Sequence, residues 1–341
     1  MAQATRAADA PAGTARDDGA APSRDRLLLA LLVAAVILAF LQPTLGGVVR
    51  VTGSGDGCPD WPQCFGSWTP PWSDHHAIIE WSHRTVGSVF GIIIFLATAV
   101  IWKRYFNQKP LLYTSTAALL LVAAVGGVGG AVVLNDLDPA IRTLHLFGAE
   151  LVAGLTVFAL VLAVYRPAFE GSWRVLPGYS REFKLTSSAT VLALAALLSG
   201  AYAVWRGAGA VCPSWPLCGG PVIPEHELVW IHVAHRLISA SAALLVLYAA
   251  HRVFRLPGAS RPLKIAALAA PVIIAGQVLM GAANPWSRFD EWARAAHLSL
   301  ATLTWVDMVF VASLLLLPYP RRGQAESAGA AGGLPAGAGM P

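Results

Sequence analysis

The chain has 341 residues, of which 56% are hydrophobic and only 13% are charged, and its formal net charge is +5. A soluble domain of ordinary composition carries about 25% charged residues, so the composition excludes that class. The positive charge lies mostly in the connections between long apolar runs. We therefore interpret it as a signal of membrane orientation and expect no nucleic-acid partner.

Eight apolar runs follow one another along the chain, and each is long enough to cross a bilayer as a helix. The expected spans are 27–47, 77–102, 112–134, 140–164, 185–205, 229–250, 264–283 and 292–317. The predicted fold class is thus an all-α protein embedded in the lipid membrane. The two chain ends, 1–25 and 319–341, are rich in Ala, Pro and Gly, and we expect disordered tails there.

Lys and Arg residues divide the connections into two sets. The chain ends and the connections at 103–110, 165–184 and 251–264 carry 17 of the 24 Lys and Arg residues. The opposite set carries only Arg50, Arg206 and Arg288. Because positively charged connections stay in the cytoplasm, we expect both chain ends on the cytoplasmic side of a prokaryotic-type cell membrane.

Two histidine pairs reveal an internal repeat. The segments EWSHR (80–84) and RTLHL (142–146) recur as HVAHR (232–236) and RAAHL (294–298). Each pair of histidines is separated by 62 residues, and the two pairs are offset by 152. This repeat predicts two pseudo-repeated four-helix bundles in the same orientation. Their expected bounds are 26–165 and 185–318, with a cytoplasmic connector at 166–184.

The repeated histidines all lie at a similar depth, six or seven residues from the outer end of their spans. They are His83, His145, His235 and His297. Two imidazoles at one level of a four-helix bundle can hold the iron of a porphyrin as axial ligands. A packing role remains for any single histidine, and a metal ion bound by protein alone would usually need further carboxylate or thiolate ligands. The pattern favours a haem in each bundle.

The two halves differ three residues before the first histidine, where Glu80 stands in one half and His232 in the other. A carboxylate is costly to bury in a membrane and is usually functional there. Glu80 could transfer protons or stabilise positive charge on a reacting group. Its structural alternative is a salt bridge with Arg84 or Arg142. The asymmetry predicts chemistry in the first half and electron storage in the second.

Four arginines also repeat, next to the candidate iron ligands or one turn outside them. They are Arg84, Arg142, Arg236 and Arg294. Guanidinium groups suit the carboxylates of porphyrin propionates, and interfacial snorkelling is the alternative. Glu150 is a further carboxylate within a span, with no counterpart in the other half.

Two cysteine loops repeat as well, GCPDWPQCFG at 57–66 and VCPSWPLCGG at 211–220. The only four cysteines are Cys58, Cys64, Cys212 and Cys218. Of the three pairings, the short gap makes pairing within each loop easiest, and a zinc site fits the spacing less well. The Lys and Arg distribution predicts that both cysteine loops face the outer side of the membrane, where oxidising conditions let disulfides persist. They could staple a lid over each pocket or serve redox exchange or haem handling.

These segments, together with LGGVVRVTGSGDGCPDWPQC and HLFGAELVAG, closely resemble the haem A synthase family from about residue 28 to 318. The resemblance implies an oxidoreductase of haem A biosynthesis, which oxidises a methyl substituent of haem O to a formyl group. It also implies partners: a haem O synthase and the assembly of terminal respiratory oxidases. The electron partner stays open.

The resemblance further implies roles for individual residues. His235 and His297 match the axial ligands of a haem b cofactor, and His83 and His145 match the proposed site of the substrate, haem O. Glu80 matches an essential glutamate of the family. The cysteine pairs match Cys58 with Cys64 and Cys212 with Cys218.

Two other classes remain as alternatives. A dihaem cytochrome b-type quinol oxidoreductase would explain the four histidines but not a carboxylate in one half alone. A haem carrier or exporter would bind the porphyrin without changing it.

Overall fold

The structure, a computed structural model, describes residues 25–165, 180–219 and 225–316. In this part of the chain it contains eight helices and no strand. The helices are α1 (Arg26–Val51), α2 (His75–Arg104), α3 (Lys109–Leu134), α4 (Pro139–Val164), α5 (Ser180–Trp205), α6 (Glu227–Phe254), α7 (Arg261–Trp286) and α8 (Glu291–Leu315). Each is long and apolar enough to cross a membrane. The protein is an integral membrane protein of the all-α class, as the sequence predicts.

Short polar residues set the helix starts. Asp25, Asp74, Asp138, Ser260 and Asp290 stand at N-cap positions, and each side chain accepts a hydrogen bond from a backbone N–H of the first turn. These bonds satisfy donors that would otherwise lack a partner. The N-caps therefore fix where a span begins more sharply than hydropathy does.

Seven of the eight helices extend beyond the expected apolar runs, whereas α8 ends at Leu315, two residues before its expected end. The largest difference is in α5, which begins at Ser180, so residues 180–184 of the expected connector are helical. Asp25 was expected in a disordered tail, but it caps α1 and also accepts hydrogen bonds from Arg104 at 3.0 Å and Tyr105 at 2.9 Å. The remainder of both tails and residues 166–179 lie outside the described residues.

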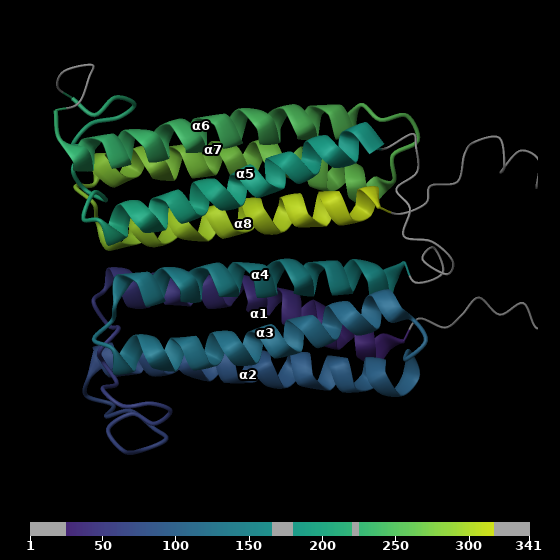
Figure 1. Cartoon of the computed structure of the whole chain (residues 1–341), viewed down its shortest axis with the longest axis horizontal. Coiled ribbons are helices and arrows are strands. Elements are labelled where there is room, and N and C mark those ends of the chain that lie inside the picture. Colours follow the sequence, from purple (N-terminus) through teal and green to yellow (C-terminus); the bar gives the residue numbers. More distant parts are fainter. Residues whose placement is uncertain (1–24, 166–179, 220–224, 317–341) are drawn as a thin grey trace, which may run out of the picture.

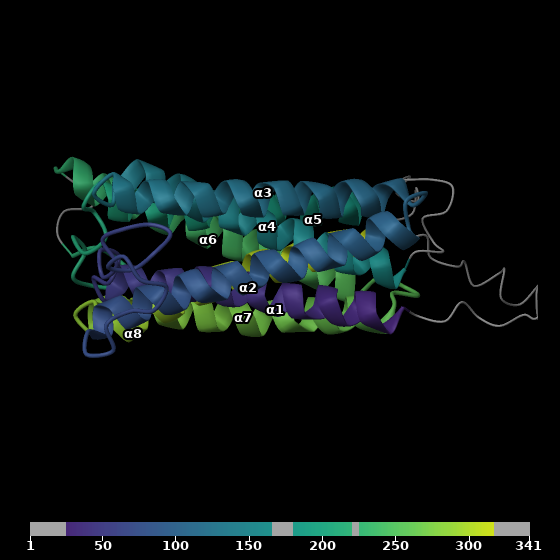
Figure 2. The ribbon, with the colours of Figure 1, turned by 90° about the horizontal axis from the view of Figure 1, so that it is seen from below.

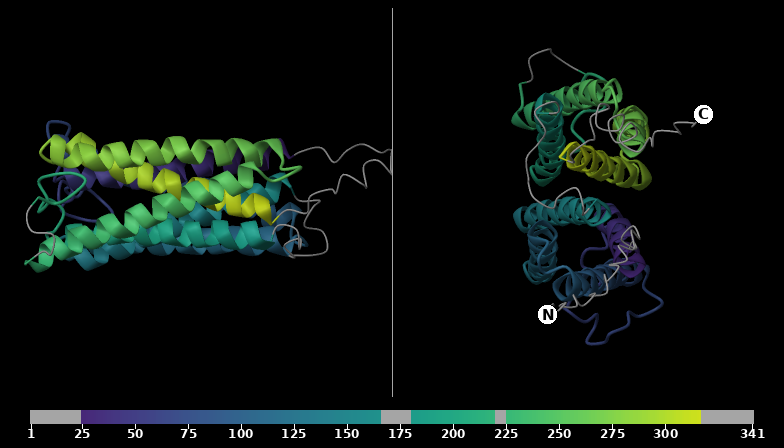
Figure 3. Two further views of the ribbon diagram at one scale, coloured as in Figure 1. Left: turned by 90° about the horizontal axis from the view of Figure 1, so that it is seen from above. Right: turned by 90° about the vertical axis from the view of Figure 1, so that its right-hand side faces the viewer.

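The eight helices form two groups of four (Figure 1). Helices α1–α4 make one group and α5–α8 the other, and all run along the long axis of the molecule (Figure 2). Seen from the end, the four helices of each group form a ring (Figure 3). The two groups meet where α8 packs against α1 and α4, with a smaller contact between α4 and α5. The connections that carry the cysteines gather at one end of the molecule (Figure 1).

A buried carboxylate lies at the contact between the two groups. Glu150 on α4 is fully buried, and its Oε1 accepts a hydrogen bond of 2.6 Å from the Thr302 hydroxyl on α8. The indole N–H of Trp305 donates to the Glu150 carbonyl at 2.8 Å. Positions 150 and 302 are offset by 152, like the histidine pairs. Equivalent positions of the two halves thus face each other across the junction, as expected where a pseudo-two-fold axis passes between parallel repeats.

This geometry predicts that Thr302→Val weakens the contact between the groups. The substitution leaves Oε1 of Glu150 buried without a donor, which costs about 1–3 kcal/mol. We expect the midpoint of thermal unfolding in detergent to fall. Thr190→Val is the matched control, because the buried Thr190 hydroxyl donates only to Thr186 of its own helix. Equal midpoints for the two variants would contradict a role for Glu150 at the junction.

Candidate functional site

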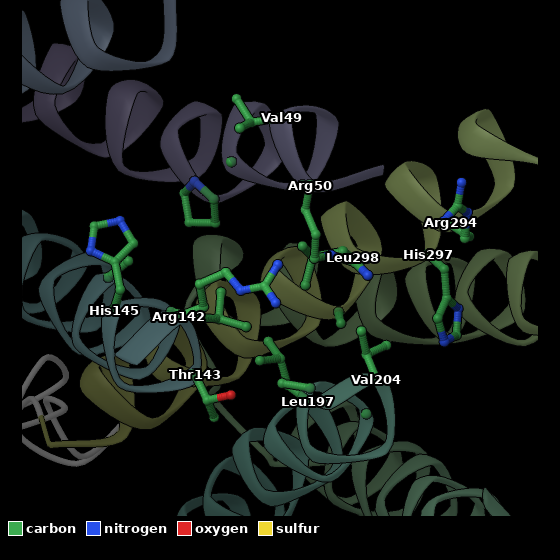
Figure 4. A pocket seen from close by; sticks show the side chains of 18 of the residues that line it. Val49, Arg50, Arg142, Thr143, His145, Leu197, Val204, Arg294, His297 and Leu298 are labelled. Atoms are coloured by element: carbon green, nitrogen blue, oxygen red, sulfur yellow. The ribbon is translucent and has the colours of Figure 1, made fainter. Parts of the chain in front are cut away.

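A cavity of about 1360 Å³ reaches all four repeated histidines. Its walls come from both helix groups, and much of the lining is made of Gly, Ala, Val and Leu. Figure 4 shows His145 of the first group and His297 of the second on opposite sides of this space, with arginines between them. Both predicted sites therefore lie in the wall of this cavity.

In the first group the structure brings His83 on α2 and His145 on α4 together. Their ring centroids lie 6.4 Å apart, with an angle of 76° between the planes. Nδ1 of His145 lies 3.0 Å from the Val125 carbonyl. Since a carbonyl can only accept, Nδ1 must carry the proton, which leaves Nε2 as the basic nitrogen. Nδ1 of His83 is buried and has no hydrogen-bond partner among the residues that the structure describes.

The second group contains the equivalent pair, His235 on α6 and His297 on α8, both lining the cavity. Nδ1 of His235 lies 2.8 Å from Oγ of Ser199. Nδ1 of His297 is buried, and within the described ranges it makes no full hydrogen bond. His232 also lines the cavity, and its Nδ1 lies 2.8 Å from the Ala208 carbonyl. That contact ties His232 to the turn that follows α5.

Glu80 lies in the wall of the cavity and is only 4% exposed. One carboxylate oxygen accepts a hydrogen bond of 2.7 Å from the backbone N–H of Cys58. The other pairs with the Arg84 guanidinium at 2.6 Å. The salt bridge expected as a structural alternative is therefore present, with Arg84 as the partner. Glu80 thus connects the cysteine loop to the cavity that holds His83 and His145.

The cysteines pair within each loop, Cys58 with Cys64 and Cys212 with Cys218. Cys58, Cys64 and Cys212 are buried. In the first loop, backbone N–H groups of Gly66 and Phe65 donate to Asp60 and hold the pKa of that carboxyl below its usual range. Trp61, Pro62 and Cys64 line the cavity. The loop therefore forms part of its wall at the end that carries the cysteines.

Two of the repeated arginines bind the cysteine loops. Arg84 donates to the carbonyls of Asp60, Gln63 and Cys58, at 2.7, 2.7 and 2.9 Å. Arg236 donates to the carbonyls of Pro216 and Ser214, both at 2.9 Å. Each guanidinium thus fixes the loop of its own half. These contacts give Arg84 and Arg236 structural partners, and propionate binding by them stays a prediction.

The other two, Arg142 and Arg294, lie in the cavity near the junction of the groups, together with Arg50 of α1 (Figure 4). Nη2 of Arg294 donates to the Val51 carbonyl at 3.1 Å, which links α8 to the end of α1. Within the described part of the chain none of the three forms an ion pair. Their positive charge is available for an anion. Arg50 was assigned to an outer connection, because the apolar run ends before it, while α1 continues to Val51.

The site residues fit an iron porphyrin. Each helix group offers two imidazoles at one level, an apolar cavity, and arginines that could take anionic carboxylates. Across the described ranges, no group of three or more His, Cys, Asp or Glu side chains is placed to hold a metal ion without further ligands. Glu150 lies outside the cavity lining, at the junction of the groups.

Comparison with known proteins agrees with this architecture. Residues 29–309 match the family described as "Cytochrome oxidase assembly protein". A "Heme A synthase" of Symbiobacterium thermophilum is 30% identical over 314 residues, which cover 89% of this chain and 100% of the relative. A "Heme A synthase" of Shouchella clausii is 32% identical, over 73% of this chain and 82% of the relative. The chain therefore belongs to the haem A synthase family of cytochrome oxidase assembly proteins.

Proposed function

We propose that this protein is a haem A synthase, an oxidoreductase that converts the methyl substituent of haem O into a formyl group. One observation carries the proposal: a single cavity reaches two histidine pairs, and the buried carboxylate Glu80 lines it in only one half. If both histidine pairs only bound a haem for electron transfer, a buried carboxylate beside one pair alone would have no purpose.

The second helix group is the proposed site of a haem b cofactor, with His235 and His297 as axial ligands. Such a haem supplies one-electron transfer when bound. The chain's own contribution is to present two neutral imidazoles and exclude water. Ser199 orients His235 from behind, in the manner of an outer-shell partner of a metal ligand.

The first helix group is the proposed site of haem O. His83 and His145 would hold its iron, and Arg142, with Arg50 and Arg294 nearby, offers positive charge for its propionates. Haem O is hydrophobic, so an apolar cavity between membrane helices suits it. Binding through iron and propionates orients the porphyrin, and this orientation decides which methyl group meets Glu80.

Glu80 is the proposed catalytic residue. Arg84 and the Cys58 N–H both stabilise its ionised form. An ionised carboxylate at the cavity wall can stabilise positive charge that develops on the substrate, or accept a proton from it. Two successive hydroxylations of the methyl group would give a geminal diol, and loss of water from the diol would give the aldehyde. Each hydroxylation removes two electrons from the methyl carbon, so it requires an external electron acceptor or an oxygen-activating route that takes them up.

The cellular setting follows from the same proposal. A haem O synthase would supply the substrate, and the product would enter the assembly of terminal respiratory oxidases. The Lys and Arg distribution supports a topology with both chain ends in the cytoplasm and both cysteine loops outside. The disulfides then lie on the oxidising side of a prokaryotic-type cell membrane.

Glu80→Gln tests the catalytic role. The amide keeps the size of the side chain and loses its charge, and acid–base groups contribute about 100- to 10,000-fold to catalysis. We expect haem A formation to fall at least about 100-fold when the variant is expressed beside a haem O synthase, as measured by chromatography of extracted haems. Wild-type haem A levels in Glu80→Gln would remove Glu80 from the mechanism.

A control for that experiment is Glu150→Gln, because Glu150 lies outside the cavity and its amide would still accept from Thr302. We expect haem A formation close to wild type. If the wild-type protein itself forms no haem A and returns haem O unchanged, the carrier or electron-transfer alternatives replace the synthase.

His297→Ala tests the cofactor site. Removing an axial ligand should cost the purified protein most of its haem b, seen as loss of the absorption band of the reduced haem. His251→Ala is the matched control, because His251 is an exposed histidine on α6 outside the cavity lining. Full haem b content in His297→Ala would contradict the assignment of this ligand.

A further inference from the structure

Each of the four repeated histidines lies against a glycine on the preceding helix. A β-carbon built on the glycine would meet Cε1 of the histidine at 3.2 Å for Gly46 and His83, 2.9 Å for Gly129 and His145, 2.9 Å for Gly200 and His235, and 3.2 Å for Gly281 and His297. Carbon atoms in favourable contact are about 3.5–4.0 Å apart. Alanine at any of these positions would therefore push against the imidazole.

The glycines repeat with the histidines. Gly46 and Gly200 are offset by 154 residues, and Gly129 and Gly281 by 152. Glycine weakens the interior of a helix relative to alanine, so helix formation does not explain these four. Their shared property is the imidazole edge that each one accommodates.

A backbone carbonyl accompanies the glycine. Val125, whose carbonyl lies 3.0 Å from Nδ1 of His145, is four residues before Gly129. Within an α-helix this carbonyl also bonds to the N–H of the residue four positions later. A carbonyl has two lone pairs, so it can accept from the histidine as well. Because the glycine has no side chain, the imidazole ring can come close enough to the helix to contact this carbonyl.

The second helix group repeats this arrangement with variations. Ala196 is four residues before Gly200, and its carbonyl accepts from the Ser199 hydroxyl at 2.7 Å. Since that hydroxyl proton is used, Oγ must accept from Nδ1 of His235. Gln277, four residues before Gly281, has its carbonyl in the corresponding position beside His297, short of a full hydrogen bond.

We propose that at His145, His235 and His297 the glycine and the carbonyl four residues before it form a seat that fixes the plane and tautomer of the histidine. At His83 the glycine alone fixes the plane of the ring, because among the described residues Nδ1 of His83 has no hydrogen-bond partner. The seat directs the Nδ1 proton toward the preceding helix, directly or through Ser199, and leaves Nε2 unprotonated for iron. Gly46, Gly129, Gly200 and Gly281 are then positioning residues. That the histidines bind iron rests on the proposed function. The packing of each histidine against its glycine does not depend on that function.

The haem b content of purified Gly281→Ala and Gly276→Ala tests the seat of His297. Both glycines lie on α7, but a β-carbon at Gly276 would make only an ordinary contact of 3.4 Å with Leu300. Loss of an outer-shell partner typically lowers metal affinity about 10- to 100-fold. We expect that loss of haem affinity, and an altered reduction potential of the remaining haem, in Gly281→Ala alone. Thermal unfolding of both variants shows whether either has merely misfolded.

The same seat can be tested without haem. In haem-free protein labelled with ¹⁵N-histidine, we expect the nitrogen shifts of His145 to report the Nδ1–H tautomer in the wild type and in Gly127→Ala. A β-carbon at Gly127 would meet no atom within 4 Å. Gly129→Ala should change these shifts. Identical shifts in all three proteins would overturn the seat, whereas a wild type that binds no haem would overturn the proposed function and leave the seat standing.

Discussion

The architecture depends on holding pairs of imidazoles at one level inside a bundle whose cavity is lined largely by apolar residues. A neutral imidazole in an apolar surrounding must still satisfy its N–H, because an unpaired donor there is expensive. His145 satisfies it at the Val125 carbonyl and His235 at Ser199. These second contacts decide which ring nitrogen is free, so the packing of neighbouring helices sets the chemistry that each histidine can perform.

The junction between the halves carries a second constraint. Glu150 and Thr302 occupy equivalent positions of the repeat and meet across it, which locks α4 against α8 in one register. His145 lies on α4 and His297 on α8, so the register that Glu150 and Thr302 set is also the register of the two pockets. Arg50, Arg142 and Arg294 gather near the same junction. The positive charge available to propionates therefore depends on the assembly of both halves.

Much of this could be predicted from sequence. Hydropathy predicts eight spans, and the offset of 152 residues predicts two helix groups with a histidine pair in each. The sequence did not predict the hydrogen-bond partners of the repeated arginines or the glycines that contact the histidines. All four repeated arginines line the cavity, yet Arg84 and Arg236 also bind carbonyls of the cysteine loops, whereas Arg294 binds the end of α1. The glycine seats were missed because glycine is common in membrane helices, although the offsets of Gly46 to Gly200 and Gly129 to Gly281 would have revealed them beside the histidines.

The asymmetry between the halves is what turns a duplicated haem-binding fold into a candidate enzyme. Mass spectrometry of the haems recovered from wild-type protein that was co-expressed with a haem O synthase tests directly whether this asymmetry supports catalysis, because the cell then supplies the electron partner. Haem b should be recovered unchanged, while haem O should be converted to a product carrying the formyl group of haem A. Recovery of haem O unchanged, from protein that retains its haem b, would contradict the synthase function.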